Sequence, residues 1–485
     1  MSESRTAIIA VDGTFTYQDL DEASKRVAGT LLGDNEDLNQ TRVAFLVSPS
    51  FAYAAVQRGI WRAGGVAIPL AVSHPPPELE YVIRDSGASV VVADAACAPR
   101  VASLARAARV RLLTSAEALA AACAEGLPHL GSNRRAMIIY TSGTTGRPKG
   151  AVTSHQNIGA QIGSLVEAWR WSPSDRLLLA LPLHHVHGII NGLGCALAVR
   201  ATCEILPEFD AERIWSRLAS GDVTVFTAVP TMYHRLIASW EAASPEVQRE
   251  RSAGARRLRL MMSGSAALPV RTLERWREIT GHTLLERYGM TEIGMALSNP
   301  IAGERRPGSV GQPLPDVEVR LVDEAGDAVS EGTPGELEVR GPTVFMEYWQ
   351  REEETRAAFR DGWFRTGDVA VLEAGSYRLL GRTSVDIIKT GGYKVSALEI
   401  EEVLRLHPAI AECAVVGVED EAWGERVSAA VELRDGATLS LDELQGWAKS
   451  QLAPYKIPRA LQEVSALPRN AMGKVVKPQV AGLFK

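Results

Sequence analysis

Short apolar runs alternate with amphipathic stretches along the first part of the chain. Residues 43–47, 66–70 and 90–94 are largely apolar runs of strand length. Residues 51–63, between the first two runs, have the spacing of a helix and end at a pair of glycines. Strands that alternate with helices indicate parallel sheets with helices on their faces. The pattern therefore predicts an α/β fold with parallel sheets.

The pattern changes after about residue 310. Residues 317–322, 335–340 and 377–380 are predicted strands joined by Gly and Asp turns, which indicates a small β-barrel-like unit. From residue 397 onward, helices and strands alternate in a tail of about a hundred residues, the size of a small domain. The elements predicted in this tail are a helix at 400–406, strands at 413–418 and 429–433, and a helix at 441–452. We expect an N-terminal domain over 1–381 and a C-terminal α+β domain over 382–485.

Composition narrows the class of protein. A chain of 485 residues exceeds the size at which single cores stop growing. The formal net charge of −6 argues against a nucleic-acid coat or a polybasic membrane anchor. No apolar run approaches the ~18 residues that span a bilayer, and the N-terminus has no secretory apolar core. The sequence as given predicts a soluble, cytoplasmic protein, and leaves the oligomeric state open. The five cysteines lack paired spacing and are expected to be free, buried thiols.

A loop rich in glycine and hydroxyl side chains follows the apolar run at 136–139. Residues 140–150 hold three glycines, several threonines and a serine, and a lysine, Lys149. Glycines let a backbone approach phosphates closely, and amides, hydroxyls and a lysine then bind the oxygens. The ordinary P-loop needs Gly-Lys at the offset where Gly143 is followed by Pro148, so this is a different phosphate loop. The alternative, a flexible linker, fits such an ordered string poorly.

Three further positions carry candidate chemistry. Glu292, beside Thr291, is a hard oxygen ligand suited to Mg²⁺. Asp368 follows a glycine and suits the hydroxyls of a ribose. Lys474, also after a glycine, can act as a mobile point charge for developing negative charge. Each residue taken singly is also compatible with an ordinary solvated surface position.

Taken together and in this order, the motifs resemble the adenylate-forming superfamily of acyl-CoA synthetases, luciferases and carrier-protein-loading domains. The resemblance covers essentially the whole chain. It implies a large N-terminal domain with a small mobile C-terminal domain over the active site. It also implies a reaction in two steps that uses ATP, Mg²⁺ and coenzyme A. A substrate carboxylate first attacks the α-phosphate of ATP, giving an acyl-adenylate and pyrophosphate, and a thiol then displaces AMP.

The resemblance assigns roles to residues by position. The catalytic residues it implies are Lys474, Glu292 and Lys149, with Glu292 as the Mg²⁺ ligand. The ATP-binding residues it implies are Thr141, Ser142, Gly143, Thr144, Thr145, Gly146, Arg147, Pro148, Lys149, Gly264, Ser265, Ala266, Tyr288, Gly289, Met290, Thr291, Asp368, Arg382 and Lys474. For CoA in the second step it implies Lys389, Gly391, Gly392 and Tyr393. The hinge falls within residues 383–386, where this chain is one residue longer than the common pattern.

Of the predicted sites, the acyl pocket is the one that the sequence determines least. His184, His185 and His187 are close in sequence, but nothing nearby completes a zinc site with ordinary spacing. The resemblance places His185 and His187 at the acyl and CoA site. Arg235 and Arg287 would suit a second carboxylate, since guanidinium forks bind carboxylates bidentately. The alternative is that Arg235 is solvated and Arg287 pairs structurally.

The strings around these arginines resemble the malonyl-CoA and methylmalonyl-CoA synthetase branch, which implies that both hold the distal carboxylate. Met295 is a candidate for the pocket wall, with plain core packing as its alternative. The first functional hypothesis is therefore a malonate or methylmalonate CoA ligase. The second is a ligase or carrier-loading enzyme for another short or aryl acid. The third, a non-catalytic relative, is disfavoured by the intact Lys149, Glu292, Asp368 and Lys474.

Overall fold

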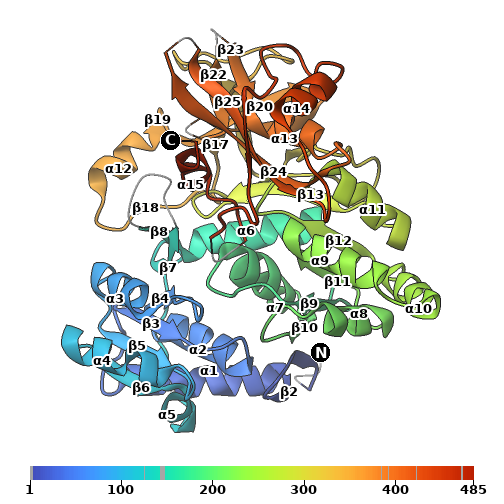
Figure 1. Ribbon diagram of the computed structural model, residues 1–485. Coiled ribbons are helices and arrows are strands. Elements are labelled where there is room, and N and C mark those ends of the chain that lie inside the picture. The colour runs from blue at the N-terminus through green and yellow to red at the C-terminus, as the bar shows by residue number, and fades with distance from the viewer. Residues whose placement is uncertain are drawn as a thin grey trace.

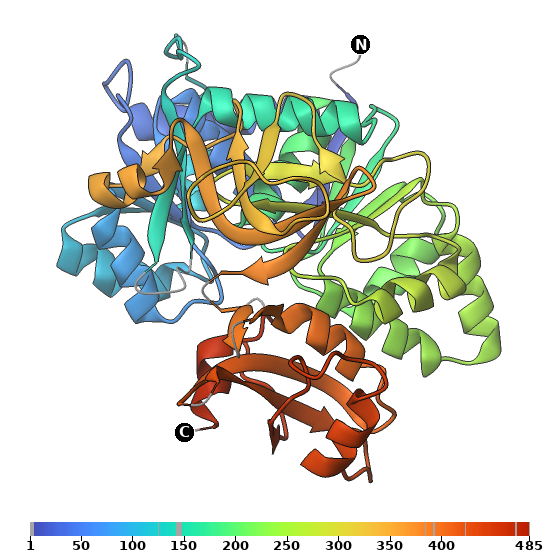
Figure 2. The same ribbon diagram turned by 90° about the horizontal axis from the view of Figure 1, so that it is seen from above.

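The computed structural model describes residues 4–124, 126–141, 148–383, 385–390, 393–421, 423–470 and 473–484. These residues form a large N-terminal domain of sheets and helices and a small C-terminal domain (Figure 1). Seen from above, the C-terminal domain, coloured orange to red, lies against one side of the larger domain (Figure 2). The fold class predicted from the sequence is confirmed.

The larger sheet of the N-terminal domain is parallel at its centre and antiparallel at both ends. Its central strands read as buried apolar runs because helices cover the sheet; β11, for example, is buried throughout. In spatial order its strands are β15 (Gln312–Pro313), β14 (Gly294–Ser298), β13 (Leu285–Met290), β12 (Leu260–Ser263), β11 (Val225–Ala228), β9 (Arg176–Leu179), β10 (Thr202–Ile205), β1 (Thr6–Ala10) and β2 (Gly13–Thr16). Strand β13 begins at Leu285 and carries Arg287 within the sheet.

A second sheet contains the apolar runs first recognised in the sequence. In spatial order its strands are β18 (Glu347–Tyr348), β8 (Lys149–Ser154), β7 (Arg135–Thr141), β4 (Val66–Pro69), β3 (Arg42–Leu46), β5 (Val90–Ala93) and β6 (Arg111–Thr114). The pairs from β7 through β4, β3 and β5 to β6 are parallel. β7 and β8 are antiparallel neighbours, with Thr141 opposite Lys149.

Helices pack on the faces of these two sheets. They are α1 (Tyr17–Leu32), α2 (Phe51–Arg62), α3 (Pro76–Asp85), α4 (Ala98–Ala108), α5 (Ser115–Ala120), α6 (His155–Ala168), the π-helix η1 (His187–Gly194), α7 (Cys195–Ala198), α8 (Ala211–Ala219), α9 (Pro230–Glu241), α10 (Pro245–Ala255) and α11 (Val270–Thr280). Helix α6 begins at a capping box formed by Ser154 and Asn157. Phe45 on β3 and Leu177 on β9 belong to one buried apolar cluster, so the two sheets share a core.

A third, antiparallel sheet follows in the chain. Its strands are β16 (Glu318–Val322), β17 (Gly335–Arg340), β20 (Trp363–Glu373) and β19 (Phe359–Arg360), with β21 (Ser376–Arg382) paired to β20 and the short helix α12 (Glu352–Ala357) beside it. Asp368 and Arg382 lie opposite each other in the β20–β21 ladder. The register therefore brings together two residues that are fourteen apart in the chain.

The C-terminal domain is a sheet with helices on both faces. Its strands are β23 (Tyr393–Ser396), β22 (Ile387–Thr390), β25 (Gly424–Leu433) and β24 (Ile410–Asp420), with β26 (Ala460–Glu463) paired to β25; its helices are α13 (Ala397–Leu404), α14 (Leu441–Ala448) and α15 (Lys477–Gly482). Apolar residues of α13 and α14 pack on one face, and Val480 of α15 packs on the other. The helix predicted to run to residue 452 ends at Ala448.

All five cysteines are free, as expected, but Cys123 is exposed rather than buried. The domain boundary predicted at residues 381 and 382 falls at the end of β21, and it stays a prediction. No helix among the described residues is long and apolar enough to cross a membrane.

Candidate active site

Arg287 lies buried on β13 at the edge of the larger sheet where several parallel strands end. Its side chain is 3% exposed, and its Nη2 donates to Nε2 of His187 at the start of η1. His187 Nε2 lies 2.7 Å from the hydroxyl of Thr227 on β11, and His187 Nδ1 lies 3.0 Å from the hydroxyl of Ser265 after β12. Because arginine only donates, Nε2 is the acceptor and Nδ1 carries the proton. Arg287, His187, Thr227, Ser265 and Gly264 form a cluster of contacts, called the carboxylate pocket below after the ligand proposed for it.

The Arg287 guanidinium is only partly used by the protein. Its Nε and Nη1 are buried and have no hydrogen-bond partner among the described residues. Burial lowers the pKa of Arg287 to about 10, so the group is still a cation at neutral pH. A Cβ on residue 264 would overlap Nη1, so only glycine leaves room for the fork at that point. A buried cation with free donors is costly, and it favours an incoming anion.

The neighbouring imidazole is neutral. Burial lowers the pKa of His187 well below its usual range, and the positive charge of Arg287 lowers it further. A neutral His187 can accept from Arg287 and donate to Ser265 at the same time, which fixes the orientation of the guanidinium. Ser265 itself has a φ of 69°, a left-handed conformation that is uncommon for a residue with a side chain. The pocket is therefore held in one arrangement by its own hydrogen bonds.

A second group of charged residues surrounds Asp368. Its Oδ1 lies 3.0 Å from Arg382 Nε, and its Oδ2 accepts from the Tyr288 hydroxyl at 2.5 Å. Burial raises the pKa of Asp368, and Arg382 and Tyr288 oppose that rise. Tyr288 and Arg287 are neighbours on β13, so this strand connects the group around Asp368 with the carboxylate pocket.

Glu292 forms a third group with Tyr348 and Lys149. The Tyr348 hydroxyl donates to Glu292 Oε1 at 2.9 Å, and Lys149 Nζ lies 5.2 Å from the centroid of the Tyr348 ring. Burial raises the pKa of Glu292, with Tyr348 acting in the opposite direction. The predicted phosphate loop begins beside this group: Thr141 Oγ1 donates to the Lys149 carbonyl at 3.5 Å. The loop residues predicted to bind ATP at 142–147 lie outside the described residues.

Lys474 enters from the C-terminal domain and approaches these groups. Burial lowers its pKa, Arg382 and Arg287 lower it further, and Asp368 partly opposes them. Lys474 also helps lower the pKa of His185 to about 4, after burial as the main cause. The adjacent Gly473 faces Thr231 of α9, at a distance that a Cβ would fill with ordinary contact. Lys474 therefore lies near enough to Arg382, Asp368 and Arg287 for their charges to act on it, so the C-terminal domain brings this lysine to the site.

Arg235 is not brought to the carboxylate pocket. It lies on α9 with its side chain exposed, and its guanidinium lies over the ring of Phe209, 4.4 Å from the centroid. The predicted pair of arginines around one pocket is therefore not formed: a strand position buries Arg287, and a helix turns Arg235 to solvent. Met295 is 2% exposed in the apolar core beside Gly289, and its backbone N–H donates to Gln161.

The three predicted histidines separate into two environments. The rings of His184 and His185 lie 4.0 Å apart, and His74 lies 5.7 Å from His184, whereas His187 belongs to the carboxylate pocket. The described residues contain no group of three His, Cys, Asp or Glu side chains arranged to hold a metal ion.

The residues predicted for CoA lie on the C-terminal domain. Lys389 is on β22, where its backbone N–H donates to Glu425, and Tyr393 is 53% exposed and stacks on Tyr455. The predicted Gly391 and Gly392 lie outside the described residues.

Two residues of the site were not predicted. Thr227 bonds His187, and Tyr348 bonds Glu292. Neither stands in a recognisable motif. The pairing of β18 with β8 brings Tyr348 beside Lys149, and such a pairing across about 200 residues leaves no local signal.

Comparison with known proteins agrees with this geometry. The AMP-binding enzyme family matches residues 1–349, and the AMP-binding enzyme C-terminal domain matches residues 399–474. The chain is 48% identical to the mitochondrial malonate–CoA ligase ACSF3 of Xenopus laevis, over 98% of this chain and 89% of that protein. It is 41% identical to a malonate–CoA ligase of Arabidopsis thaliana, over 98% and 86%. The crystal structure of ATP-bound MatB from Rhodopseudomonas palustris superimposes with a TM-score of 0.92 at 36% identity, covering 100% of this chain and 96% of that one. The chain belongs to the family of AMP-binding enzymes.

Proposed function

We propose that this protein is an ATP-dependent malonate–CoA ligase. It forms malonyl-CoA through an acyl-adenylate, releasing pyrophosphate in the first step and AMP in the second. The observation that carries the proposal is the buried Arg287, whose Nε and Nη1 are free to bind a carboxylate while the groups around Asp368, Glu292 and Lys474 lie beside it. The relatives named malonate–CoA ligases support the same acid.

A dicarboxylate suits the carboxylate pocket for an electrostatic reason. The distal carboxylate would receive two parallel hydrogen bonds from the Arg287 fork, and that pairing is stronger and more directional than one with lysine. A fatty acid would instead leave a buried, unpaired cation against its apolar chain. His187 and Ser265 hold the fork in place, and Gly264 leaves it room.

ATP is proposed to bind through the groups around Asp368 and Glu292 and through the glycine-rich loop. Asp368 is assigned to the ribose hydroxyls and Arg382, its partner, to the nucleotide. The loop residues 141–148 and Lys149 are assigned to the phosphates. Gly264 to Ala266 and Tyr288 to Thr291 line the adenine side. These assignments follow the family pattern and the proximity of the described members.

The chemistry of the first step needs no nucleophile from the protein. The reacting carboxylate of malonate attacks the α-phosphorus, the bond to pyrophosphate breaks, and the acyl-adenylate remains bound. The protein contributes orientation and charge. Arg287 orients the acid from its distal end, and Lys474 supplies positive charge where the carboxylate and the α-phosphate meet.

Magnesium fits at Glu292. This carboxylate is buried, its pKa is raised by that burial, and its Oε1 accepts from the neutral Tyr348 hydroxyl, which suits a hard dication shared with phosphates. Bound there, Mg²⁺ would neutralise charge on the phosphate oxygens. Tyr348 holds one oxygen of Glu292 in place for it.

The second step is assigned to a part of the C-terminal domain other than the one that carries Lys474. Lys389, Gly391, Gly392 and Tyr393 are proposed to admit the pantetheine arm of CoA after the domain has turned, and the thiol then attacks the acyl carbon and expels AMP. His185 is proposed to line this approach, and Met295 to bound the acyl pocket. The C-terminal domain would turn about the domain boundary at residues 381 and 382. A cytoplasmic location also stays a prediction, while the named animal relative is mitochondrial.

Methylmalonate stays a second candidate substrate. One methyl group contributes only ~1–3 kcal/mol to discrimination between two acids, and the amount depends on the local shape of the pocket. A panel of malonate, methylmalonate, succinate, acetate, benzoate and octanoate, each assayed for CoA-dependent AMP release, tests the acid directly. Malonate is expected to give the highest kcat/KM, and equal turnover of octanoate would contradict the proposal.

The substitution Arg287→Met tests the pocket itself. Loss of a buried charge partner costs about 2–5 kcal/mol, so kcat/KM for malonate is expected to fall by roughly 30- to 5,000-fold. Acetate, which has no distal carboxylate, is expected to change little. The matched control is Arg235→Met, which removes an exposed arginine of the same domain and is expected to change malonate turnover less than about twofold. A larger effect from the control than from Arg287→Met would overturn the assignment.

A further inference from the structure

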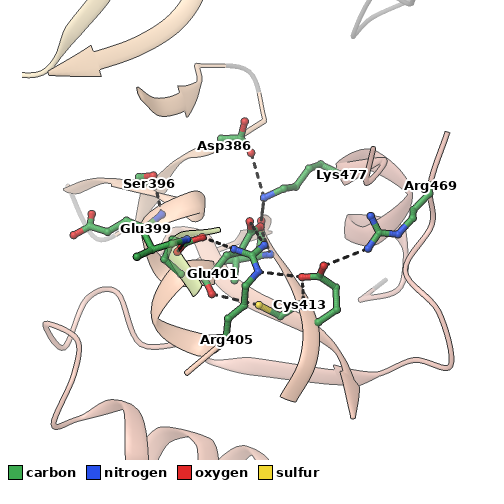
Figure 3. Close-up of polar contacts among 12 residues, drawn as sticks. Asp386, Ser396, Glu399, Glu401, Arg405, Cys413, Arg469 and Lys477 are labelled. Carbon is green, nitrogen blue, oxygen red and sulfur yellow. Dashed lines mark hydrogen bonds and ion pairs between the residues drawn. The ribbon is translucent and has the colours of Figure 1, made fainter. Parts of the chain in front are cut away.

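The C-terminal domain contains a partly buried set of paired charged side chains (Figure 3). Lys477, at the start of α15, has a side chain that is only 12% exposed. Its Nζ lies 3.2 Å from Asp386 Oδ1, donates to the Val415 carbonyl at 2.7 Å and pairs with Glu401 Oε1. Three acceptors thus surround one ammonium group three residues after Lys474.

Arg405 extends this set to the residue that precedes Lys474 in the chain. Its Nη2 lies 3.5 Å from Glu401 Oε2, and its Nε lies 3.1 Å from Glu412 Oε1. Arg469 Nη2 in turn lies 3.4 Å from Glu412 Oε2, and Arg469 Nη1 donates to the carbonyl of Gly473 at 2.8 Å. Arg405 is therefore linked to both flanks of Lys474. Through Glu412 and Arg469 it reaches the Gly473 carbonyl, and through Glu401 it reaches the Lys477 side chain.

Asp386 connects this set to the nucleotide side. Its Oδ2 accepts from the backbone N–H of Arg382 at 3.0 Å, while its Oδ1 faces Lys477. Gly381 has a φ of 121°, and a Cβ there would overlap the Asp386 side chain, so the close approach requires glycine. Arg382 is the residue that pairs with Asp368. One continuous path of contacts thus runs from Asp368, through the junction between the domains, to both flanks of Lys474.

The charges along this path are extensively paired. We call Asp386, Glu401, Glu402, Arg405, Glu412, Arg469 and Lys477 the ion network; it holds four anions and three cations, and Glu402 joins it through a 2.8 Å contact with Arg405. Burial lowers the pKa of Lys477, but Glu401 and Asp386 more than offset it, so the net shift is upward. Removing one member leaves a buried ion without its partner, which is costly. The network therefore resists small displacements of the segment that carries Lys474.

We propose that Lys477 and Asp386 are positioning residues for the adenylation step, which place Lys474 at the reacting carboxylate through the ion network and its link to Arg382. The proposal rests on the function proposed above, in which Lys474 serves adenylation and not thioester formation. The two half-reactions should therefore respond differently when the network is broken, whereas a merely structural role would affect both.

The experiment measures the two half-reactions separately. Malonate-dependent exchange of labelled pyrophosphate into ATP reports adenylation, and CoA-dependent consumption of presynthesised malonyl-adenylate reports thioester formation. The variants are Asp386→Asn, which keeps the side-chain shape, and Lys477→Met, which removes the charge. The matched control is Lys456→Met, because Lys456 pairs with Glu399 at 2.7 Å in the same domain but outside the network.

Displacement of a catalytic group by about 1 Å can cost on the order of 100-fold, so both network variants are expected to lower the exchange kcat by roughly 10- to 100-fold. KM for ATP and malonate, and thioester formation, are expected to stay within about threefold. Lys456→Met is expected to leave both half-reactions within about twofold.

Equal loss of both half-reactions in Asp386→Asn, or unchanged exchange in that variant, would overturn the proposal. Thermal unfolding of each variant identifies simple loss of folding, and Asp386→Asn remains decisive if Lys477→Met does not fold. Failure of the wild-type protein to exchange pyrophosphate with malonate, while another acid of the panel supports exchange, would count against the proposed substrate instead. The same variants would then be compared with that acid.

Discussion

The carboxylate pocket is buried and the ion network is partly buried; both are charged, yet their hydrogen bonding differs. In the carboxylate pocket, Arg287 keeps two nitrogens without partners among the described residues. In the ion network, Arg405 and Lys477 each contact several carboxylate oxygens. An incomplete set of partners leaves binding free energy for a ligand, whereas a complete set stabilises one geometry. Whether a buried charge serves binding or positioning therefore depends on its partners rather than on its residue type.

Lys474 stands between the two regions, and its removal is expected to have the largest effect. In Lys474→Ala, adenylation is expected to fall by roughly 100- to 1,000-fold, because a charge placed at the developing transition state is lost. ATP affinity is expected to stay within about threefold, measured by calorimetric titration. Retained pyrophosphate exchange would show that the network positions a residue that adenylation does not need.

Breaking the ion network is expected to destabilise the protein. In Arg405→Met, Glu401 and Glu412 lose their shared cation, at a cost of about 3–5 kcal/mol in the free energy of unfolding of the C-terminal domain. Denaturant unfolding followed by the fluorescence of Trp447 and Trp423 measures this. An unchanged midpoint would mean that the network contributes no stability.

Replacing Arg287 in the carboxylate pocket is expected to change the free energy of unfolding in the opposite direction. In Arg287→Met, an unpaired buried cation is replaced by an apolar side chain of similar length, so the ligand-free protein is expected to gain about 1–2 kcal/mol. Differential scanning calorimetry without substrates measures the shift. Destabilisation by Arg287→Met as large as that of Arg405→Met would remove the distinction between the two regions.

Glu286 shows a third way to bury an ionisable group. Burial raises its pKa to about 8, and the Gly308 N–H bond only partly opposes this. Since the folded protein keeps a proton that the unfolded chain releases near pH 4.5, the contribution of Glu286 to stability is full below that pH and is lost as the pH rises through 8. In Glu286→Gln, the fall in Tm between pH 6 and pH 8.5 is expected to shrink by a few degrees. An unchanged pH slope would contradict this.

Much of the fold followed from periodicity alone. The apolar runs at 43–47 and 90–94 became β3 and β5, and the β-rich unit and the α+β tail appeared where the pattern changed. Ends of elements were less accurate, since the helix predicted at 400–406 spans Ala397–Leu404 and the helix predicted to reach residue 452 ends at Ala448. Local propensity does not determine where packing stops a helix or extends a strand.

The amino-acid sequence by itself singled out Asp368 and Lys474, each after a glycine, and Glu292, beside a threonine, because such chemistry needs particular residue types at particular spacings. It treated Arg235 and Arg287 as equals. Only the tertiary structure separated them, by placing one on an exposed helix face and the other in a sheet beside His187. The partners Tyr348 and Thr227, and the path from Asp386 through Lys477 to Lys474, were likewise decided there. Such contacts join residues distant in the chain, and they form only when burial of apolar surface has brought the sheets and both domains together.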